Sequence, residues 1–379
     1  MRFLIPCCLS SLFLLSSCLG TPSSSESAGP APIVGAWPVD HLIQPGEGHF
    51  RHLWQVTVDG ENAEGYWSFA GDRLVLQRSH KAEGVDCDRI YVTLPERGPI
   101  DGAEAFRSIR PIDQVSDGRG ATTCAYFLPG DRSVVFASTG GHMEGCPPPV
   151  DFSQGYTWAI RPEYDLFVHD FDSGTTSALT EGWGYDAEAT VSPRGDRMVF
   201  TSTRSGDLEL WTCDLDGSNR VQVTDTLGYD GGAFFSHDGT RLVFRTTAFT
   251  PGKEAEEQAT YRALLDDWKV RPHSMEIMLI DADGSNRTQL THLGQANFAP
   301  FFFPDDQRVI FSTNHHEEGA RNFDLFAIGV DGEALERITH YEGFDSFPMF
   351  SPNGRYLVFA SNRGGTQAGE TNLFLAEWR

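Results

Sequence analysis

The segment SPNGRYLVFASN, residues 351–362, carries the pattern that decides the fold. Its Pro-Asn-Gly turn suits a tight hairpin, because proline presets φ at the first corner and glycine accepts the positive φ that ends a three-residue loop. The β-branched and aromatic residues that follow predict a strand. Segments that align with this strand occur six times, at residues 73–79, 133–139, 197–203, 241–247, 308–314 and 356–362.

Each aligned segment is one of four strands in a repeating unit, which we call a to d. The aligned segment is strand b, and strand c follows it at residues 207–211, 275–279, 323–327 and 371–375. Strand d ends in a threonine, at Thr224, Thr291 and Thr339. The a–b turns at Pro304 and Pro352 lie 48 residues apart, which is close to the length of one propeller blade.

The two ends of the repeat array predict how the ring closes. The last unit ends after strand c, at Trp378, whereas His52–Thr57 has the pattern of strand d with no strand a, b or c before it. We therefore expect an all-β, six-bladed β-propeller over residues 51–379. The N-terminal strand completes the last blade and covers its open edge. A helical insertion is expected in blade 4.

These features resemble the TolB-type propeller repeat, with its Ser-Pro-Asp-Gly turn and its closing Leu-Thr. The resemblance spans residues 51–379 and implies the fold. It does not imply one function, because such repeats serve in envelope scaffolds, in peptidase accessory domains and in lyases. The protein that names the family also has an N-terminal α/β domain, whereas here we expect only a tether before the ring.

The N-terminal residues predict export. An apolar run is followed by Ser16-Ser17-Cys18, which resembles the signal of a bacterial lipoprotein. That resemblance implies removal of residues 1–17, a lipid on Cys18 and a place in the cell envelope, facing the periplasm or the exterior. Leu19 favours the outer membrane if the cell is Gram-negative. The alternative is an ordinary secretory signal. Residues 18–50 are rich in Ser, Gly and Pro, which predicts a flexible tether.

The composition limits the partners of this protein. Lys and Arg number 29 against 53 Asp and Glu, a formal net charge of −24, so the surface repels phosphate backbones and no nucleic acid is expected to bind. Hydrophobic residues form 40% of the chain, enough for a large core. No segment past the N-terminus is long enough to span a bilayer. We expect a monomer that contacts the membrane only through the lipid at Cys18.

The loops of a propeller separate into two faces, and here one face is far more elaborate. The b–c and d–a loops share a face, and the longest b–c loops are residues 139–163 in blade 2 and 250–274 in blade 4. Apolar residues recur at helical spacing from Tyr261 to Trp268, which predicts a helix that Pro272 ends. This helix either packs on its own propeller or forms a lid over the central funnel.

Four cysteines follow Cys18 in the sequence. Cys213 replaces an aliphatic residue in a strand and is expected to be a buried free thiol. Cys87, Cys124 and Cys146 all map to the long-loop face, and an exported protein favours one disulfide among these three. The sequence does not select the pair.

Polar residues recur at the start of strand a, which is the innermost strand of each blade. We expect them to ring the funnel mouth and bind a ligand, together with Glu188 in the same strand as Asp186. The equivalent positions are Asn62, Thr122, Asp186, Asp230, Asn297 and Asp345. Converging carboxylates repel one another, so Ca²⁺ or Mg²⁺, or a basic group of a partner, would neutralise them in the central channel. The alternative is structural, because Asp and Asn also cap turns.

No catalytic motif is present in the sequence. It contains no Gly-x-Ser-x-Gly elbow, His-Glu-x-x-His motif, P-loop or dinucleotide fingerprint. We therefore expect a non-catalytic envelope lipoprotein that binds a protein, peptide or cell-wall ligand on its long-loop face. The alternative is a metal-assisted lyase or hydrolase acting on a polysaccharide or acidic polymer in the funnel. His315 and His316 are its candidate metal ligands.

Overall fold

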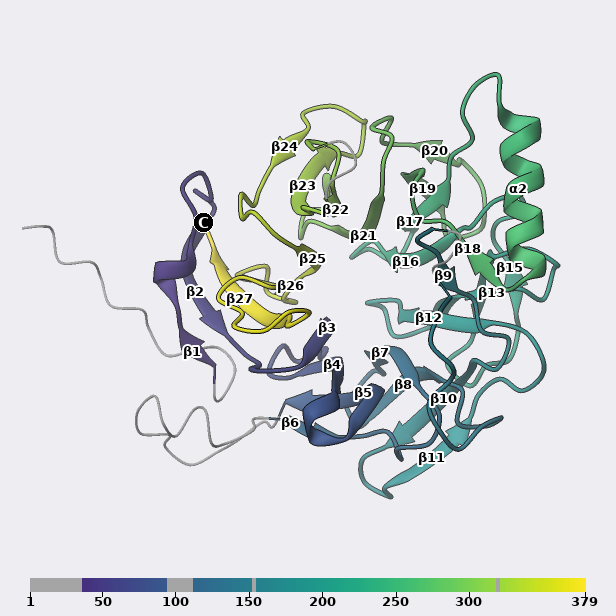
Figure 1. Cartoon of the computed structure of the whole chain (residues 1–379), viewed down its shortest axis with the longest axis horizontal. Coiled ribbons are helices and arrows are strands. Elements are labelled where there is room, and N and C mark those ends of the chain that lie inside the picture. The colour runs from purple at the N-terminus through teal and green to yellow at the C-terminus, as the bar shows by residue number, and fades with distance from the viewer. Residues whose placement is uncertain (1–35, 94–111, 152–154, 318–320) are drawn as a thin grey trace, which may run out of the picture. The chain divides into compact units, whose positions relative to one another are not determined.

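The chain forms a ring of six antiparallel sheets around a central axis (Figure 1). The computed structural model describes residues 36–93, 112–151, 155–317 and 321–379. Within each sheet the strands run from the axis outward in the order a, b, c, d, so the innermost strands of all six blades face one another. The six-bladed all-β fold predicted from the repeats is confirmed.

Five blades each take their four strands from one continuous stretch of the chain. Blade 1 contains β3 (Glu61–Trp67), β4 (Leu74–His80), β5 (Val85–Thr93) and β6 (Ile112–Gln114). Blade 2 contains β7 (Thr122–Phe127), β8 (Ser133–Ser138), β10 (Asp165–Asp170) and β11 (Thr175–Ala178). Blade 3 contains β12 (Asp186–Val191), β13 (Met198–Ser202), β14 (Glu209–Cys213) and β15 (Val221–Gln222). Blade 4 contains β16 (Gly231–Phe235), β17 (Arg241–Thr247), β19 (Met275–Asp281) and β20 (Thr288–Gln289). Blade 5 contains β21 (Asn297–Phe302), β22 (Arg308–Thr313), β23 (Asp324–Gly329) and β24 (Glu336–Arg337).

Blade 6 joins the two ends of the described chain. It contains β25 (Asp345–Phe350), β26 (Tyr356–Ser361) and β27 (Asn372–Trp378), and its fourth strand is β2 (Phe50–Gln55). β2 pairs antiparallel with β27 and so occupies the place of strand d. The short strand β1 (Trp37–Pro38) then pairs with the outer side of β2.

Residues 36–50 correct the predicted tether, which was expected to reach residue 50. They carry β1 and the 3₁₀ helix η1 (Asp40–Leu42), and they pack on blade 6. Glu47 is buried and pairs with the buried Arg363 at 3.0 Å. The Gly and Pro content suggested flexibility, but glycine here allows close packing: a Cβ on Gly46 would lie 2.9 Å from the His340 ring. Residues 1–35, with Cys18, lie outside the described residues.

The threonine that ends strand d has a repeated structural role. In each of blades 2 to 6 its hydroxyl oxygen accepts a hydrogen bond of 2.8–2.9 Å from a backbone N–H of strand c. The threonines are Thr180, Thr224, Thr291, Thr339 and Thr57. Strand d pairs over only a few residues, so the side chain extends the ladder by one bond. Ser116 does the same in blade 1, at 3.0 Å from the Ile90 nitrogen.

The core lies between neighbouring blades. Strand b is covered on both faces because each blade packs against two others, and all five residues of β13 are buried. This explains why segments such as Leu242-Val-Phe lack the alternation of a half-exposed strand: side chains on both faces are inside the protein.

The two long loops are fastened to each other and to the ring. β9 (Trp158–Ala159) of blade 2's loop pairs with β18 (Lys269–Val270) of blade 4's loop. A Cys87–Cys146 disulfide ties the first part of blade 2's loop to blade 1. It resolves the pairing that the sequence left open, with Cys124 and Cys213 as free thiols, the latter buried.

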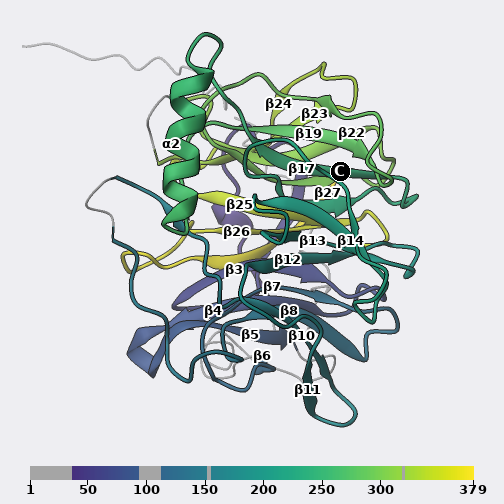
Figure 2. The ribbon, with the colours of Figure 1, turned by 90° about the vertical axis from the view of Figure 1, so that its right-hand side faces the viewer.

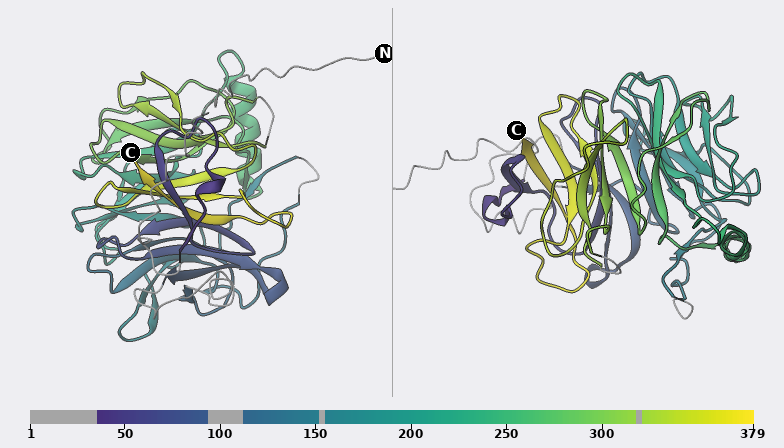
Figure 3. Two further views of the ribbon diagram at one scale, coloured as in Figure 1. Left: turned by 90° about the vertical axis from the view of Figure 1, so that its left-hand side faces the viewer. Right: turned by 90° about the horizontal axis from the view of Figure 1, so that it is seen from above.

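The helix α2 (Glu254–Asp266) lies at the outer edge of the ring and projects from one of its faces (Figures 2 and 3). Its one buried residue, Tyr261, donates a hydrogen bond of 2.5 Å from its hydroxyl to Asp207 of blade 3. The helix ends earlier than Pro272, because Trp268 takes a left-handed φ of 56° and turns the chain into β18. No helix within the described ranges is long and apolar enough to cross a membrane.

Candidate ligand site on the long-loop face

The innermost strand of every blade bulges at the same place. The register shifts in all six pairs of strands a and b. One bulge residue in each has a φ of 50–60°: Glu64, Cys124, Glu188, Gly232, Ala299 and Phe347. A left-handed backbone costs a residue with a side chain roughly 1–2 kcal/mol. Five non-glycine residues therefore hold a strained conformation that the surrounding ring sustains.

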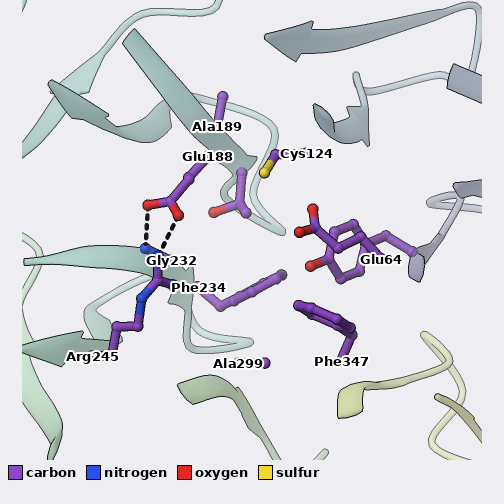
Figure 4. A pocket seen from close by; sticks show the side chains of 11 residues that line it. Glu64, Cys124, Glu188, Ala189, Gly232, Phe234, Arg245, Ala299 and Phe347 are labelled. Atoms are coloured by element: carbon purple, nitrogen blue, oxygen red, sulfur yellow. Dashed lines mark hydrogen bonds and ion pairs between the residues drawn. The ribbon is translucent and has the colours of Figure 1, made fainter. Parts of the chain in front are cut away.

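All six bulge residues line one cavity on the axis of the ring (Figure 4). Its volume is about 40 Å³, which is room for a few water molecules. The channel is filled beyond it by aromatic rings, since Tyr66 of blade 1 lies 5.4 Å from Phe234 of the opposite blade and 5.9 Å from Tyr126. The cavity is thus the floor of the funnel.

Glu188 is the most fully bonded acid in this cavity. One carboxylate oxygen accepts hydrogen bonds from Arg245 and from the Tyr229 hydroxyl, and the other accepts them from Thr201 and the Gly232 N–H. Burial by itself would raise the pKa of Glu188, but the charge of Arg245 and these donors outweigh it and lower the pKa. Glu188 is therefore ionised, and the positive charge of Arg245 balances its negative charge.

Glu64 faces the same cavity without such compensation. Its Oε2 is buried and has no hydrogen-bond partner in the described part of the chain. Burial raises the pKa of Glu64 to about 7, and the charge of Glu188 adds to this, against the opposing effects of the Cys124 hydrogen bond and the Arg245 charge. Near neutral pH this carboxyl group is poised between its two protonation states.

The other predicted site residues are bonded within the walls of the ring. Asp186, Asp230 and Asp345 pair with Arg204, Arg287 and Arg363 at 2.8, 2.7 and 2.7 Å. Asn62, Thr122 and Asn297 donate to backbone carbonyls of the preceding blade, at Thr371, Asp88 and Met275. Of the seven predicted residues, Glu188 is the one that lines the axial cavity. The seven predicted residues thus lie around the ring, in its six blades, and do not meet at one point.

Sequence reasoning missed Glu64, Arg245 and Trp158. A signal for Glu64 was present, because it follows Asn62 by the same two positions that separate Glu188 from Asp186. Arg245 lies in strand b, where the repeat otherwise suggests core residues, and nothing local marks it as the counter-ion of Glu188.

Trp158, in the b–c loop of blade 2, covers Arg245 of the axial cavity. We call residues 155–160 the strap, because they run from blade 2 to the pairing with β18 of blade 4. The indole of Trp158 lies 5.3 Å from the Arg245 guanidinium carbon and meets the rings of Tyr229 and Phe298 edge-on, at 6.3 and 6.1 Å. The same guanidinium carbon lies 4.7 Å from the centre of the Tyr229 ring. A cation that contacts two aromatic rings is stabilised by both of them.

A larger groove of about 870 Å³ lies beside the strap. The strap forms one wall, blade 4's loop adds Pro272 and His273, and blades 5 and 6 form the rest. The lining residues are mostly apolar or aromatic: Gly155, Tyr156, Trp158, Pro272, His273, Gln295, Ala296, Phe298, Asn314, Arg321, Phe323 and Phe344. Trp158 separates this groove from the axial cavity, because it contacts both Phe298 and Arg245.

The candidate histidine pair is not arranged as a metal centre. His315 Nδ1 lies 3.1 Å from the Leu293 carbonyl oxygen, while His316 stacks on Phe326 and lies 2.9 Å from Asp324. Over the described ranges, no group of three or more His, Cys, Asp or Glu side chains is placed to hold a metal ion.

Comparisons with known proteins agree with this architecture. Residues 268–368 match the family model of the TolB beta propeller domain. TolB from Acinetobacter baumannii superposes with a TM-score of 0.50 at 18% identity, over 84% of this chain and 64% of that protein. The chain thus spans less than two thirds of that TolB.

An oligogalacturonate lyase from Vibrio parahaemolyticus also superposes with a TM-score of 0.50, at 10% identity, over 90% of this chain and 96% of the lyase. At these identities both likenesses concern the fold alone. A comparison with curated protein sequences finds no match. The repeats, the ring of six blades and the matched segment together show a six-bladed β-propeller that is similar to the TolB beta propeller domain.

Proposed function

We propose that this protein is a non-catalytic binding propeller of the cell envelope, which holds a protein, peptide or cell-wall ligand in the groove beside the strap. The observation that supports this proposal is the size and lining of the groove. Ligand sites are typically concave, mostly apolar and about 300–1,000 Å³ in volume, with a few polar groups that orient the ligand. The groove has this size and this kind of lining.

The walls of the groove are held in place before any ligand arrives. The strap is bonded to blade 4's loop by β9–β18 pairing, and its parent loop is tied to blade 1 by the Cys87–Cys146 disulfide. Phe298 is buried among Phe323, Phe344 and Phe347 of blades 5 and 6. A preorganised site loses less conformational entropy on binding, which favours affinity.

The envelope location rests on two features. A structural disulfide is typical of oxidising compartments outside the cytosol. The N-terminal sequence up to Cys18 resembles a lipoprotein signal, so we propose that the chain is anchored by a lipid on Cys18 and otherwise acts as a monomer.

A blocking variant tests the proposal. Ala296→Trp fills the groove from its blade 5 wall, and Val221→Arg places an equally drastic change at an exposed strand d residue outside the groove. Calorimetry with a panel of short peptides, muropeptides and neutral or acidic oligosaccharides should find a ligand that binds wild type and Val221→Arg but not Ala296→Trp. Binding that Ala296→Trp leaves unchanged, or a panel without any ligand at millimolar concentration, would overturn the proposal.

A further inference from the structure

The groove differs in charge from the protein around it. Acidic residues outnumber basic ones by 53 to 29 in the chain, yet none of the groove-lining residues that the structure describes is acidic. Arg321 supplies a positive charge and His273 a second group that can carry one. The neighbouring pocket beside α2 shows the opposite pattern, with four acids in its lining: Asp207, Glu209, Asp225 and Asp266. The described lining of the groove is therefore more basic than that of the pocket beside α2.

Arg321 is available to bind such a group. Its side chain is exposed, and it has no acidic partner within the described ranges. By contrast, Arg245 and Arg204 are held in ion pairs with Glu188 and Asp186. An unpaired guanidinium presents a planar fork of N–H donors, which fits the two oxygens of a carboxylate in parallel hydrogen bonds.

The rest of the lining suits an apolar body. Five aromatic side chains face the groove, from the strap and from blades 5 and 6: Tyr156, Trp158, Phe298, Phe323 and Phe344. They offer edges and faces for a planar ring, and burial of apolar surface against them favours binding. The amide side chains of Gln295 and Asn314 stand at the same walls as polar groups that orient a ligand.

We infer that the groove recognises a carboxylate carried on an apolar, preferably aromatic, body. This inference rests on the proposed function and names its ligand class. Arg321 binds the carboxylate and the aromatic walls bury the body. Two sources present this chemistry, a free organic acid and the C-terminal residue of a peptide that ends in a large apolar side chain.

Paired probes that differ only in charge test the inference. Calorimetry on the whole protein would compare 3-phenylpropionate with 3-phenylpropionamide, and the peptide Gly-Gly-Phe with its C-terminal amide. We expect each acid to bind at least tenfold more tightly than its amide. If 3-phenylpropionate binds as well as the peptide, the groove recognises a free organic acid. If only the peptide binds, the groove recognises the C-terminal residue of a peptide.

Variants of Arg321 assign the preference to one side chain. Arg321→Met should abolish the difference between acid and amide, and Arg321→Lys should keep part of it. Arg262→Met is the matched control, because Arg262 lines the pocket beside α2, and it should keep the full preference. Equal binding of acid and amide to wild type, or a preference that survives Arg321→Met, overturns the inference.

The two proposals fail in distinguishable ways. Acids and amides that bind equally, and are both lost in Ala296→Trp, would leave a binding groove with a different ligand class. A panel and probes that all fail to bind would overturn both the groove's function and its ligand class.

Discussion

Gly232 shows how one residue organises the floor of the funnel. It is the one glycine among the six bulge residues, and it adopts the left-handed φ without the steric cost that a Cβ brings. Packing also requires glycine here, because a Cβ at this position would collide with the guanidinium of Arg245. The Gly232 N–H also donates a hydrogen bond to Glu188. The backbone bulge and the positions of the Glu188 and Arg245 side chains therefore all depend on this glycine.

Gly232→Ala should therefore be more destabilising than a left-handed alanine alone. We expect a loss of about 2–5 kcal/mol in the free energy of unfolding, since strain adds to displacement of a buried ion pair. Gly174→Ala is the control, because Gly174 has a φ of 66° with open space around it. It should cost only about 1–2 kcal/mol. Urea denaturation measures both, and equal losses would show that Arg245 simply moves aside.

Glu64 should make stability depend on pH. Burial raises its pKa from 4.5 to about 7 in the folded protein, so the folded state binds this proton more tightly than the unfolded state. The stabilisation that results is complete below pH about 4.5 and is lost as the pH rises through about 7. Relative to Glu64→Gln, the wild type should lose up to about 3 kcal/mol across this range.

Urea melts of both proteins from pH 4 to 8 check this expectation. The difference between them isolates Glu64 from the other acids that titrate in the same range. Glu333→Gln, at an exposed glutamate, should track the wild type at every pH. A constant difference between wild type and Glu64→Gln would contradict an uncompensated buried carboxyl group.

The residues of the site were only partly predictable, for a physical reason. The alignment of the repeats predicted which residues begin strand a, but the bulge that follows changes which side chains reach the axis. Ala299, Cys124 and Phe347 do not favour a left-handed backbone, so nothing in their identity announces the bulge. Glu188 was identified through its charge, two positions after Asp186. Glu64 lies two positions after Asn62, and it would have been found if the same spacing had been applied to blade 1.

At the scale of elements, the strap connects blades that are distant in sequence. β9 and β18 are two residues long and about 110 positions apart, so no local periodicity predicts that they pair. Strand b of each blade was predictable because its pattern occurs six times, and strands c and d were then found from the copies that follow it. The helix was predictable from its apolar spacing, but its end was set by Trp268 rather than by Pro272.

Loss of the Cys87–Cys146 disulfide should loosen this loop and lower the stability of the whole ring. The bridge spans 59 residues, and the chain-entropy model gives a loop of that size about 4 kcal/mol. Cys146→Ser should melt at a lower temperature than wild type, and a reductant should bring wild type down to the same value. Cys213→Ser, which removes a buried free thiol, should still respond to reductant. A wild type that ignores reductant would contradict the bridge.

At the scale of the whole molecule, one pairing joins the first described residues to the last. β2 covers the edge of β27, and Arg379 N–H donates to the His49 carbonyl at 2.9 Å, so the end of β27 lies beside the start of β2. An uncovered β27 would present unpaired backbone groups to other molecules. Glu47 adds to the closure by its buried pair with Arg363, which also pairs with Asp345.

We therefore expect ring closure to require β2, but not to require that β2 be connected to the N-terminal side of blade 1. A chain of residues 59–379 alone should aggregate or fail to fold, because blade 6 lacks its outer strand. A permuted chain, in which a short Gly-Ser linker joins Arg379 to residues 47–58, restores both β2 and Glu47 through a simple hairpin connection. It should be monomeric by size-exclusion chromatography and melt cooperatively. If the truncated chain is monomeric and melts like the full protein, β2 is dispensable. If the truncated and permuted chains both aggregate, the ring needs residues 36–46 as well.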